Sequence, residues 1–301
     1  MNNSELFKSI LLGVLDFFVK VCEENGLKYY LAFGSVLGAV RHKGMIPWDD
    51  DIDIHMPRDD YEKLRRLPDA VWGKDYRLAS WEKPRHYRYD FLKLEALNTT
   101  LIEKIHPDYV GGLFIDIFPL DNYPSDTDYI KKIETEVTGV YSKILTCAIK
   151  HDNECNSLYE LLVLKLKRLF YNHRSTVGSL ERIAQSSGGK GEMTADFHNY
   201  FFRNGGRGGW PSDVFGEGTP LEFEGKVYLV PDKWDAYLTH LYGDYMTPPP
   251  IEKRYGHHFD YVNCERRLSG AELKEEFRRI HRKYAFRFSM KKELKQLLHR
   301  P

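Results

Sequence analysis

Residues 46–54 constrain the fold of this chain most, because they place four aspartates among three isoleucines. Successive side chains of a β-strand point to opposite faces, so Asp49, Asp51 and Asp53 are expected on one face and the last two isoleucines on the other. Carboxylates on one face and core residues on the other predict a strand that presents a rigid metal site. An acidic surface loop is the alternative interpretation of the same residues.

A third carboxylate is expected from a neighbouring strand, and Asp116 is the candidate. It lies inside the apolar run 113–118, where an ionised carboxylate is costly unless it is paired or bound to metal. Mg²⁺ (or Mn²⁺) takes oxygen ligands and leaves other positions to water and substrate phosphates. We therefore predict that Asp51, Asp53 and Asp116 are catalytic metal ligands, with Asp49 as a candidate fourth ligand. A hydrogen-bonded structural aspartate is the alternative for Asp116.

A turn of small residues precedes the acidic segment. Gly34 and Ser35 lie where a predicted strand, 28–33, gives way to a predicted short helix. Backbone N–H groups at such a turn, helped by the helix dipole, can bind a phosphate. Arg41 and Lys43 follow within reach of the same phosphate, and a plain surface charge is the alternative for each.

The remaining pattern predicts an α/β (α+β) protein. Apolar residues at helical spacing begin after Ser4, and Gly26 can end that helix. Strands are predicted at 28–33, 51–56, 76–79, 91–95 and 113–118, and a hairpin or strand at 223–230. Further helices are predicted at 36–40, from Pro57, at 128–150, from Ser157, at 231–241 and from Ser269 to about 288. Glycine-rich loops are expected over 186–218.

Composition narrows the class of protein further. The 44 Lys and Arg equal the 44 Asp and Glu, so the global charge does not indicate a nucleic-acid partner. The four cysteines form no Cys-x-x-Cys pair, and we expect free thiols in a reducing cytoplasm. Residues 10–21 are too short an apolar stretch to span a bilayer. A cytoplasmic protein is therefore expected.

Together these motifs resemble the LicD family of phosphocholine transferases in the nucleotidyltransferase-like superfamily, to which fukutin and fukutin-related protein are similar. The resemblance covers residues 5–262 and departs from the family pattern at Ser35, where threonine is frequent, and at His258, where glutamate is frequent. The motifs that carry it are 33–42, 46–54, 56–61, 114–121 and 242–254.

The resemblance implies transfer of a phosphoalcohol, most directly phosphocholine, from a CDP-activated donor such as CDP-choline to a sugar hydroxyl, with release of CMP. The acceptor would be a precursor of lipopolysaccharide or teichoic acid, either free or linked to a lipid. Asp116 is the expected general base, and Asp121 is a second candidate for that base. Asp121 is also expected to contact the substrate, and His257 is expected to contact the phosphate or the acceptor. CDP-ribitol, CDP-glycerol or CDP-ethanolamine as donor, nucleotidyl transfer, and a non-catalytic choline- or glycan-binding module are the alternatives.

The resemblance also implies an organisation of the chain. A nucleotidyltransferase-like mixed sheet is expected as catalytic core in 1–125, a helical insertion in 126–185, glycine-rich loops and the rest of the catalytic domain in 186–268, and a basic helix and tail in 269–301. The basic tail and the apolar-basic run 161–170 suit peripheral contact with the inner membrane face.

A choline head group is best held by aromatic faces. With 14% aromatic residues, most rings belong to packing, so each candidate has a structural alternative. The aromatic residues near motifs or predicted loops are Trp48, Trp81, Tyr87, Tyr89, Trp210, Tyr242 and Tyr245.

Overall fold

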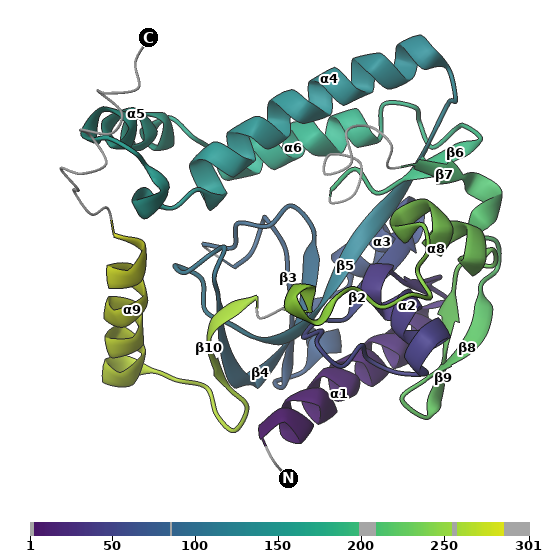
Figure 1. Ribbon diagram of the computed structural model, residues 1–301, viewed down its shortest axis with the longest axis horizontal. Helices are drawn as coiled ribbons and strands as arrows, with labels where there is room; N and C mark the ends of the chain where they lie inside the picture. Colours follow the sequence, from purple (N-terminus) through teal and green to yellow (C-terminus); the bar gives the residue numbers. More distant parts are fainter. Residues whose placement is uncertain (1–2, 85, 199–208, 255–257, 286–301) are drawn as a thin grey trace.

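The computed structural model describes residues 3–84, 86–198, 209–254 and 258–285. Its centre is a mixed β-sheet, and the predicted α/β class is confirmed (Figure 1). The main strands, in spatial order, are β1 (Tyr30–Leu31), β2 (Asp53–Pro57), β5 (Gly111–Tyr123), β4 (Leu92–Glu103) and β10 (Phe259–Asn263). β2 and β5 run parallel, whereas the other neighbours in this order are antiparallel.

Shorter strands extend the sheet. β3 (Tyr76–Ala79) pairs with β4, at the predicted residues. β6 (Met193–Ala195) and β7 (Gly209–Pro211) continue from the end of β5, so the segment expected to hold only loops contributes two strands. A separate hairpin is formed by β8 (Thr219–Phe223) and β9 (Lys226–Val230).

One face of the sheet is covered by α1 (Asn3–Asn25), which lies against β4 and β5 (Figure 1). Leu15 and Phe18 of this helix are fully buried in the same core as Ile54, Ile115 and the other inward residues of β2 and β5. Burial of each such side chain stabilises the fold by about 1.5–3 kcal/mol. α3 (Arg58–Arg66) follows β2 directly, as predicted from Pro57.

A layer of helices lies on the other side of the molecule (Figure 1). It consists of α4 (Thr127–Ile144), α5 (Leu158–Leu169) and α6 (His173–Ala184), and α4 and α6 share an apolar cluster with Tyr123 and Phe197. All three helices fall inside the predicted helical segment 126–185. The predicted division into domains stays a prediction.

The sequence predicts capping boxes at two helix starts, Ser157 with Glu160 and Ser269 with Glu272. The first forms by half: the Ser157 hydroxyl accepts the N–H of Glu160 at 3.1 Å, but the Glu160 carboxylate accepts the N–H of Asn156 in place of that of Ser157. The box predicted at Ser269 is wrong, because Ser269 makes no side-chain cap of α9 (Gly270–Tyr284) and Glu272 instead pairs with Arg266 at 2.6 Å.

The turn expected at Gly34 and Ser35 is absorbed into a helix. α2 (Phe33–His42) begins one residue earlier, since Phe33 at φ 44° turns the chain straight from β1 into the helix. The Phe33 N–H is bound by the Tyr237 hydroxyl at 2.9 Å, and Tyr237 belongs to α8 (Trp234–Tyr242). The strand predicted at 28–33 is therefore only two residues long.

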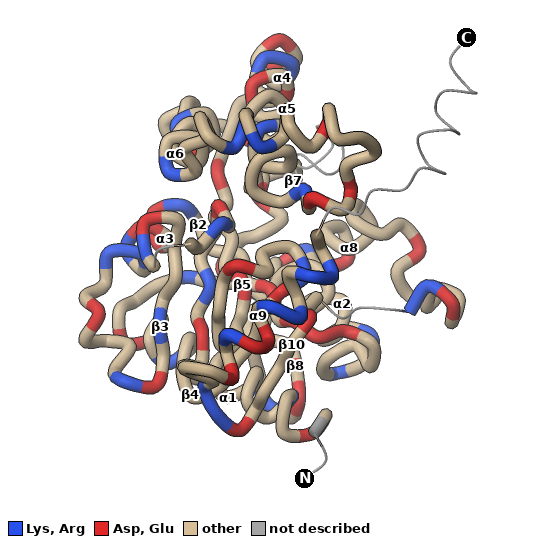
Figure 2. Tube along the Cα trace, turned by 90° about the vertical axis from the view of Figure 1, so that its left-hand side faces the viewer, with Lys and Arg blue, Asp and Glu red and all other residues tan. Residues whose placement is uncertain are grey.

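Acidic and basic residues are interspersed over the chain (Figure 2), in line with its zero net charge. Among the described helices, none is both long enough and apolar enough to cross a bilayer.

Candidate active site

A row of charged side chains crosses three neighbouring strands. In the parallel pairing of β2 with β5, Asp53 lies opposite Asp116. In the antiparallel pairing of β5 with β4, Lys93 lies opposite the same Asp116. The Lys93 ammonium is fully buried, 2.6 Å from Asp116 Oδ1 and 3.4 Å from the Glu103 carboxylate. The sequence analysis predicted the two aspartates on neighbouring strands but missed Lys93, whose only signal was a lone cation in the apolar run 91–96.

The other acidic side chains reach the row from the segment before β2. The strand begins at Asp53, not at Asp51 as predicted, because the chain forms a turn in which the Asp49 N–H donates to the Ile46 carbonyl at 2.9 Å. Asp49 and Asp51 nevertheless line the same cavity as Asp53 and Asp116. The structure thus places all four predicted metal ligands along one cavity. Within the described residues, however, the carboxylates of Asp51, Asp53 and Asp116 do not come within 4.8 Å of one another as a set of three, so their joint role as ligands stays a prediction.

Burial and mutual repulsion act on the protonation of these carboxylates. Burial, followed by the charge of Asp51, raises the pKa of Asp49 to about 8. Burial, with the charges of Asp51 and Asp116, holds the pKa of Asp53 well above its ordinary value. Burial likewise raises the pKa of Asp116 to about 7, although Lys93 opposes this shift. Such a set of oxygen donors fits a hard divalent cation, whose charge would allow all the carboxylates to ionise together.

Gly34 allows the acidic turn to approach α2. A β-carbon built on Gly34 would lie 2.6 Å from Asp49 Oδ2, closer than real contacts permit. Gly34 was predicted as a phosphate contact. In the structure its lack of a side chain leaves the space that the Asp49 carboxylate occupies.

Replacing Gly34 with alanine is expected to push the Asp49 carboxylate away from the other acids and to weaken Mg²⁺ binding about tenfold, the loss of about one charge-assisted contact. Titration calorimetry with Mg²⁺ measures the change. Gly139→Ala, on the open side of α4 where a new β-carbon meets nothing within 4 Å, is the matched control. Unchanged affinity in Gly34→Ala would show that Asp49 does not contribute to the metal site.

Ser35 positions the neighbouring strand. Its hydroxyl is buried and accepts the backbone N–H of Asp53 at 3.0 Å. The hydroxyl proton stays available as a donor, so a phosphate contact by Ser35 stays a prediction. The hydrogen bond fixes the first residue of β2, and with it the direction of the Asp53 side chain.

His258 closes the acidic segment from the other side. Its Nδ1 lies 2.6 Å from Asp50 Oδ1 and 3.5 Å from Asp51 Oδ2. The hydrogen bond with Asp50 is the main reason that the pKa of His258 rises to about 9, so the ring is cationic at neutral pH. Asp50, Asp51 and His258 offer ligand atoms within 4.8 Å of one another. Without metal the cationic ring neutralises these acids, and a metal bound there would have to displace its proton. His257 lies outside the described residues.

The cavity above the acids has a volume of about 590 Å³ and is rich in aromatic side chains. Of the aromatic residues singled out from the sequence, Tyr89 and Tyr242 line it. Its other aromatic lining residues are Phe33, Phe91, Phe114, Phe118 and Tyr141, none of which the sequence analysis selected.

The other predicted aromatic residues lie elsewhere. Trp48 packs against the Arg41 and Arg254 guanidinium groups, at 5.9 and 4.7 Å, and Trp81 packs against Arg65 at 5.5 Å. The remaining three are buried against other groups: Tyr87 donates to the Phe91 carbonyl, Trp210 stacks on Tyr237, and Tyr245 donates to Asp235.

Two predicted phosphate contacts are not brought to the cavity. The Arg41 guanidinium donates to the Tyr245 carbonyl at 2.7 Å. The exposed Lys43 ammonium lies 3.5 Å from Glu222 on β8. Neither side chain lines the cavity that holds the carboxylates.

Asp121 belongs to a buried ion network behind the site. Both of its carboxylate oxygens accept from the Arg58 guanidinium, at 2.6 and 2.7 Å, and Arg58 also binds Glu181 of α6 at 2.7 Å. His198 continues the network, 3.2 Å from Glu181 and 3.2 Å from Asp90. Asp121 thus joins the sheet to the helical layer and lines a different cavity from Asp116.

The His198 ring gives a pH-dependent contribution to stability. Although burial opposes protonation, Glu181 and Asp90 raise the pKa of His198 from 6.5 to about 10. Its contribution is fully present below pH 6.5 and is lost as the pH rises through 10. We expect His198→Gln to lower the free energy of unfolding strongly at pH 6 and much less at pH 10, measured by urea denaturation. The exposed variant His240→Gln is the control, and a pH-independent difference would contradict the assignment.

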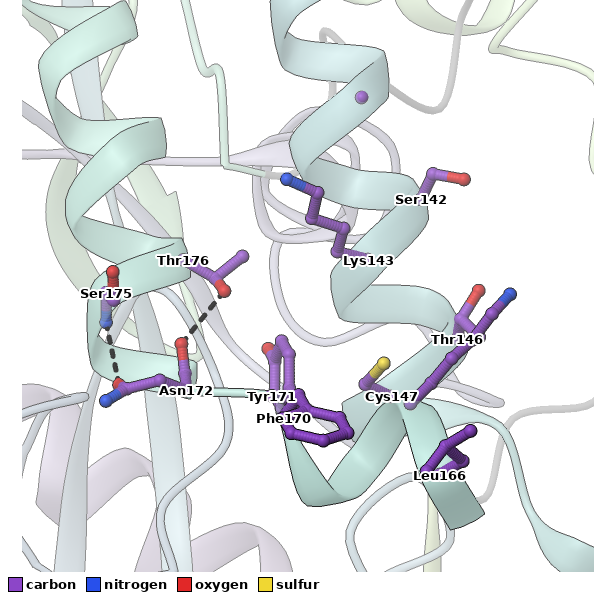
Figure 3. A pocket seen from close by; sticks show the side chains of 12 residues that line it. Ser142, Lys143, Thr146, Cys147, Leu166, Phe170, Tyr171, Asn172, Ser175 and Thr176 are labelled. Carbon is purple, nitrogen blue, oxygen red and sulfur yellow. Dashed lines mark hydrogen bonds between the residues drawn. The ribbon is translucent and has the colours of Figure 1, made fainter. Parts of the chain in front are cut away.

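A second hollow, of about 870 Å³, lies between α4, α5 and α6 (Figure 3). Its lining includes Lys143, Cys147 and Phe170 but no carboxylate. It lacks the acids of the candidate site and is separate from it.

The comparisons with known proteins agree with this geometry. Residues 26–142 match the family model described as LicD/FKTN/FKRP, nucleotidyltransferase domain, which includes the acidic turn, Lys93 and Asp116. This part of the chain, about two fifths of its length, is thus similar to the LicD nucleotidyltransferase domain.

Relatives of this chain include named transferases. The chain is 27% identical over 256 residues to lipopolysaccharide cholinephosphotransferase LicD of Haemophilus influenzae, which is 83% of this chain and 93% of that protein. It is 42% identical over 67 residues to human ribitol 5-phosphate transferase FKRP, 22% of this chain and 14% of that protein. An uncharacterized protein of Rickettsia typhi is 51% identical over 107 residues, 35% of this chain and 31% of that protein.

Proposed function

We propose that this protein is a phosphoalcohol transferase that moves phosphocholine from CDP-choline to a sugar hydroxyl and releases CMP. The observation that carries the proposal is the pairing of Asp53 with Asp116 across parallel strands beneath an aromatic cavity, inside the part of the chain that is similar to the LicD nucleotidyltransferase domain. The named relatives transfer choline phosphate and ribitol 5-phosphate, which supports phosphoalcohol transfer as the class of reaction.

Asp51, Asp53 and Asp116 would hold Mg²⁺ or Mn²⁺, with Asp49 as a further ligand. When bound, this metal would neutralise charge on the donor diphosphate and on the departing CMP. The acceptor hydroxyl oxygen forms a bond to the phosphorus that bears the alcohol, and the bond from that phosphorus to the CMP oxygen breaks. Asp116 is the candidate to take the acceptor proton, through the carboxylate oxygen that Lys93 does not bind.

Lys93 positions Asp116 for this role. Its ammonium is held over the Phe114 ring at 3.3 Å and near the Tyr89 ring at 4.2 Å. These contacts and the 2.6 Å bond to Asp116 leave the base carboxylate little rotational freedom. One Asp116 oxygen is thereby occupied, and the other is left for metal or acceptor.

The lining of the cavity favours choline among the alcohols. Tyr89, Phe91, Phe118 and Tyr141 line the cavity and suit a quaternary ammonium, which forms no hydrogen bonds and is attracted to aromatic rings. Asp90 also lines the cavity and adds a carboxylate, which accepts the Tyr141 hydroxyl at 2.8 Å. A polyol such as ribitol would instead need several hydrogen-bonding partners.

Incubation of the purified protein with CDP-choline, CDP-ethanolamine, CDP-glycerol and CDP-ribitol tests the proposal. We expect Mg²⁺-dependent release of CMP, fastest with CDP-choline. Release of pyrophosphate from a nucleoside triphosphate, with no CMP from any CDP-alcohol, would instead indicate nucleotidyl transfer. Metal-independent choline binding without any CMP release would indicate a binding module.

A peripheral membrane contact would bring the enzyme to a lipid-linked acceptor at the inner membrane face. α5 exposes between 50% and 77% of Leu158, Tyr159, Leu162, Leu166 and Leu169, and Phe170, which follows the helix, is 79% exposed. Lys165, Lys167 and Arg168 lie on the same helix and give it a basic border that suits anionic lipid head groups, although Lys165 and Arg168 also pair with Asp152. In α9, Lys283 likewise pairs with Asp260 and His281 with Asp108. The predicted basic tail beyond residue 285 lies outside the described residues.

We expect the protein to sediment with vesicles that contain 30% phosphatidylglycerol and to stay in solution with neutral vesicles. The double substitution Leu162→Glu and Leu166→Glu should reduce the bound fraction at least tenfold, since it places charges where lipid contact is expected. Val227→Glu, an exposed apolar side chain on β9, is the control. Equal binding of all three proteins would contradict contact through α5.

A further inference from the structure

A cleft of about 490 Å³, distinct from the hollow between α4, α5 and α6, adjoins the cavity that holds Asp53 and Asp116, which we call the donor cavity. The cleft is bounded by α5, by α9 and by the loop that follows β4. Arg88, Ile105, His106 and Ile149 line both spaces, so the two share a wall. A ligand in the cleft therefore lies next to a donor in the cavity.

The sign of the charge reverses between the two spaces. The donor cavity is lined by aspartates and Glu103, whereas the cleft has four Lys and Arg side chains and two Asp side chains. Its cations are Arg88, Lys150, Lys165 and Arg168. A cleft with this balance attracts an anion and disfavours the cationic choline group.

Most of these cations already have acidic partners. Lys165 and Arg168 bind Asp152 at 2.6 and 2.7 Å, and Lys150 binds Glu160 at 2.5 Å. Within the described part of the chain, the half-buried Arg88 guanidinium has no acidic partner or hydrogen bond, and it stands on the shared wall. An anion that binds Arg88 would hold the rest of its molecule at the boundary with the donor cavity.

His106 provides a second, independent feature of this wall. The side chain is 4% exposed, and its Nε2 has no hydrogen-bond partner among the described residues. Its ring stands perpendicular to Tyr89, with centroids 4.3 Å apart. Burial and the nearby His173, Lys93 and Arg88 hold the pKa of His106 well below its ordinary value, so the ring is neutral at pH 7. A buried polar atom without a partner is costly, which indicates that a ligand supplies one.

We propose that this cleft is the acceptor subsite and that the acceptor is a sugar carrying a phosphate group, which Arg88 binds while His106 Nε2 hydrogen-bonds to the sugar or its phosphate. This inference rests on the proposed transferase function and adds the class of acceptor to it. Arg88 forms the charge-assisted contacts that favour a sugar phosphate over the sugar alone. The phosphate belongs either to a soluble sugar phosphate or to a lipid-linked sugar.

Calorimetric titration in EDTA separates this subsite from the donor site, because without metal the acidic cavity repels phosphate. We expect glucose 6-phosphate to bind the wild type at least tenfold more tightly than glucose. Arg88→Gln should remove most of this preference, Arg88→Lys should retain part of it, and His106→Phe should weaken both ligands while keeping the ring on Tyr89. Arg66→Gln, an exposed arginine on α3, is the matched control.

Titration with vesicles that contain phosphatidic acid provides the second arm. Binding to these vesicles that depends on Arg88, without binding of glucose 6-phosphate, would support the subsite and assign the phosphate to a lipid. Equal affinity for glucose and glucose 6-phosphate with no Arg88-dependent lipid binding, or an unchanged preference in Arg88→Gln, would overturn the proposal. Metal-dependent CMP release, assayed separately, tests the transferase function and fails or succeeds independently of these titrations.

Discussion

The Asp53→Asn variant is expected to lose about a thousandfold in the rate of CMP release and most of its Mg²⁺ affinity. Asparagine keeps the shape of the side chain but removes the charge that lies between Asp51 and Asp116. A thousandfold loss corresponds to about 4 kcal/mol of transition-state stabilisation, the scale expected for a metal ligand in phosphoryl transfer. Initial rates with CDP-choline and calorimetric Mg²⁺ titration measure the two effects.

The fold of Asp53→Asn should persist, because the Ser35 hydroxyl binds the backbone N–H of residue 53 and not its carboxylate. An unchanged melting temperature would establish this. Asp59→Asn, the same substitution at an exposed position in the first turn of α3, is the control and should keep full activity. Retention of more than a tenth of the wild-type rate in Asp53→Asn would rule out this carboxylate as a metal ligand.

The Lys93→Met variant is expected to lose roughly 3 to 5 kcal/mol in the free energy of unfolding, the cost of breaking a buried ion pair by removing one partner. Methionine fills similar volume but leaves the Asp116 and Glu103 carboxylates without their cation. The melting temperature should fall by about 10 °C. Urea denaturation and thermal scans give the two values.

The double variant Lys93→Met with Asp116→Asn should be more stable than Lys93→Met alone, since it removes one of the unpaired charges. This comparison stays informative if the single variant folds poorly. Lys63→Met, which breaks an exposed pair with Asp60, is the control and should change stability by less than about 1 kcal/mol. A Lys93→Met protein as stable as the control would mean that the buried pair is already compensated by other groups.

Much of the fold followed from local patterns. Three elements were predicted from patterns that span only a few residues, and the structure confirms them. They are the first helix, strand β3 and the helix that begins after Pro57. The ends of β4 and β5 were underestimated, because long strands buried on both faces continue through polar residues that find partners only in the tertiary structure. The strands β6 and β7 were missed for the same reason, since β6 pairs with the distant end of β5 and β7 pairs with β6.

By itself, the sequence determined which residues carry charge into an apolar setting: Asp53 after a buried isoleucine and Asp116 between two others. Period-two alternation is a local property, so it predicted the face on which each aspartate lies. Only the tertiary structure decided the register that sets Asp53, Asp116 and Lys93 in one row, the aromatic walls of the cavity, and the separation of Lys43 from it. Register and cavity walls arise from contacts between segments far apart in the chain, whose geometry no local pattern encodes.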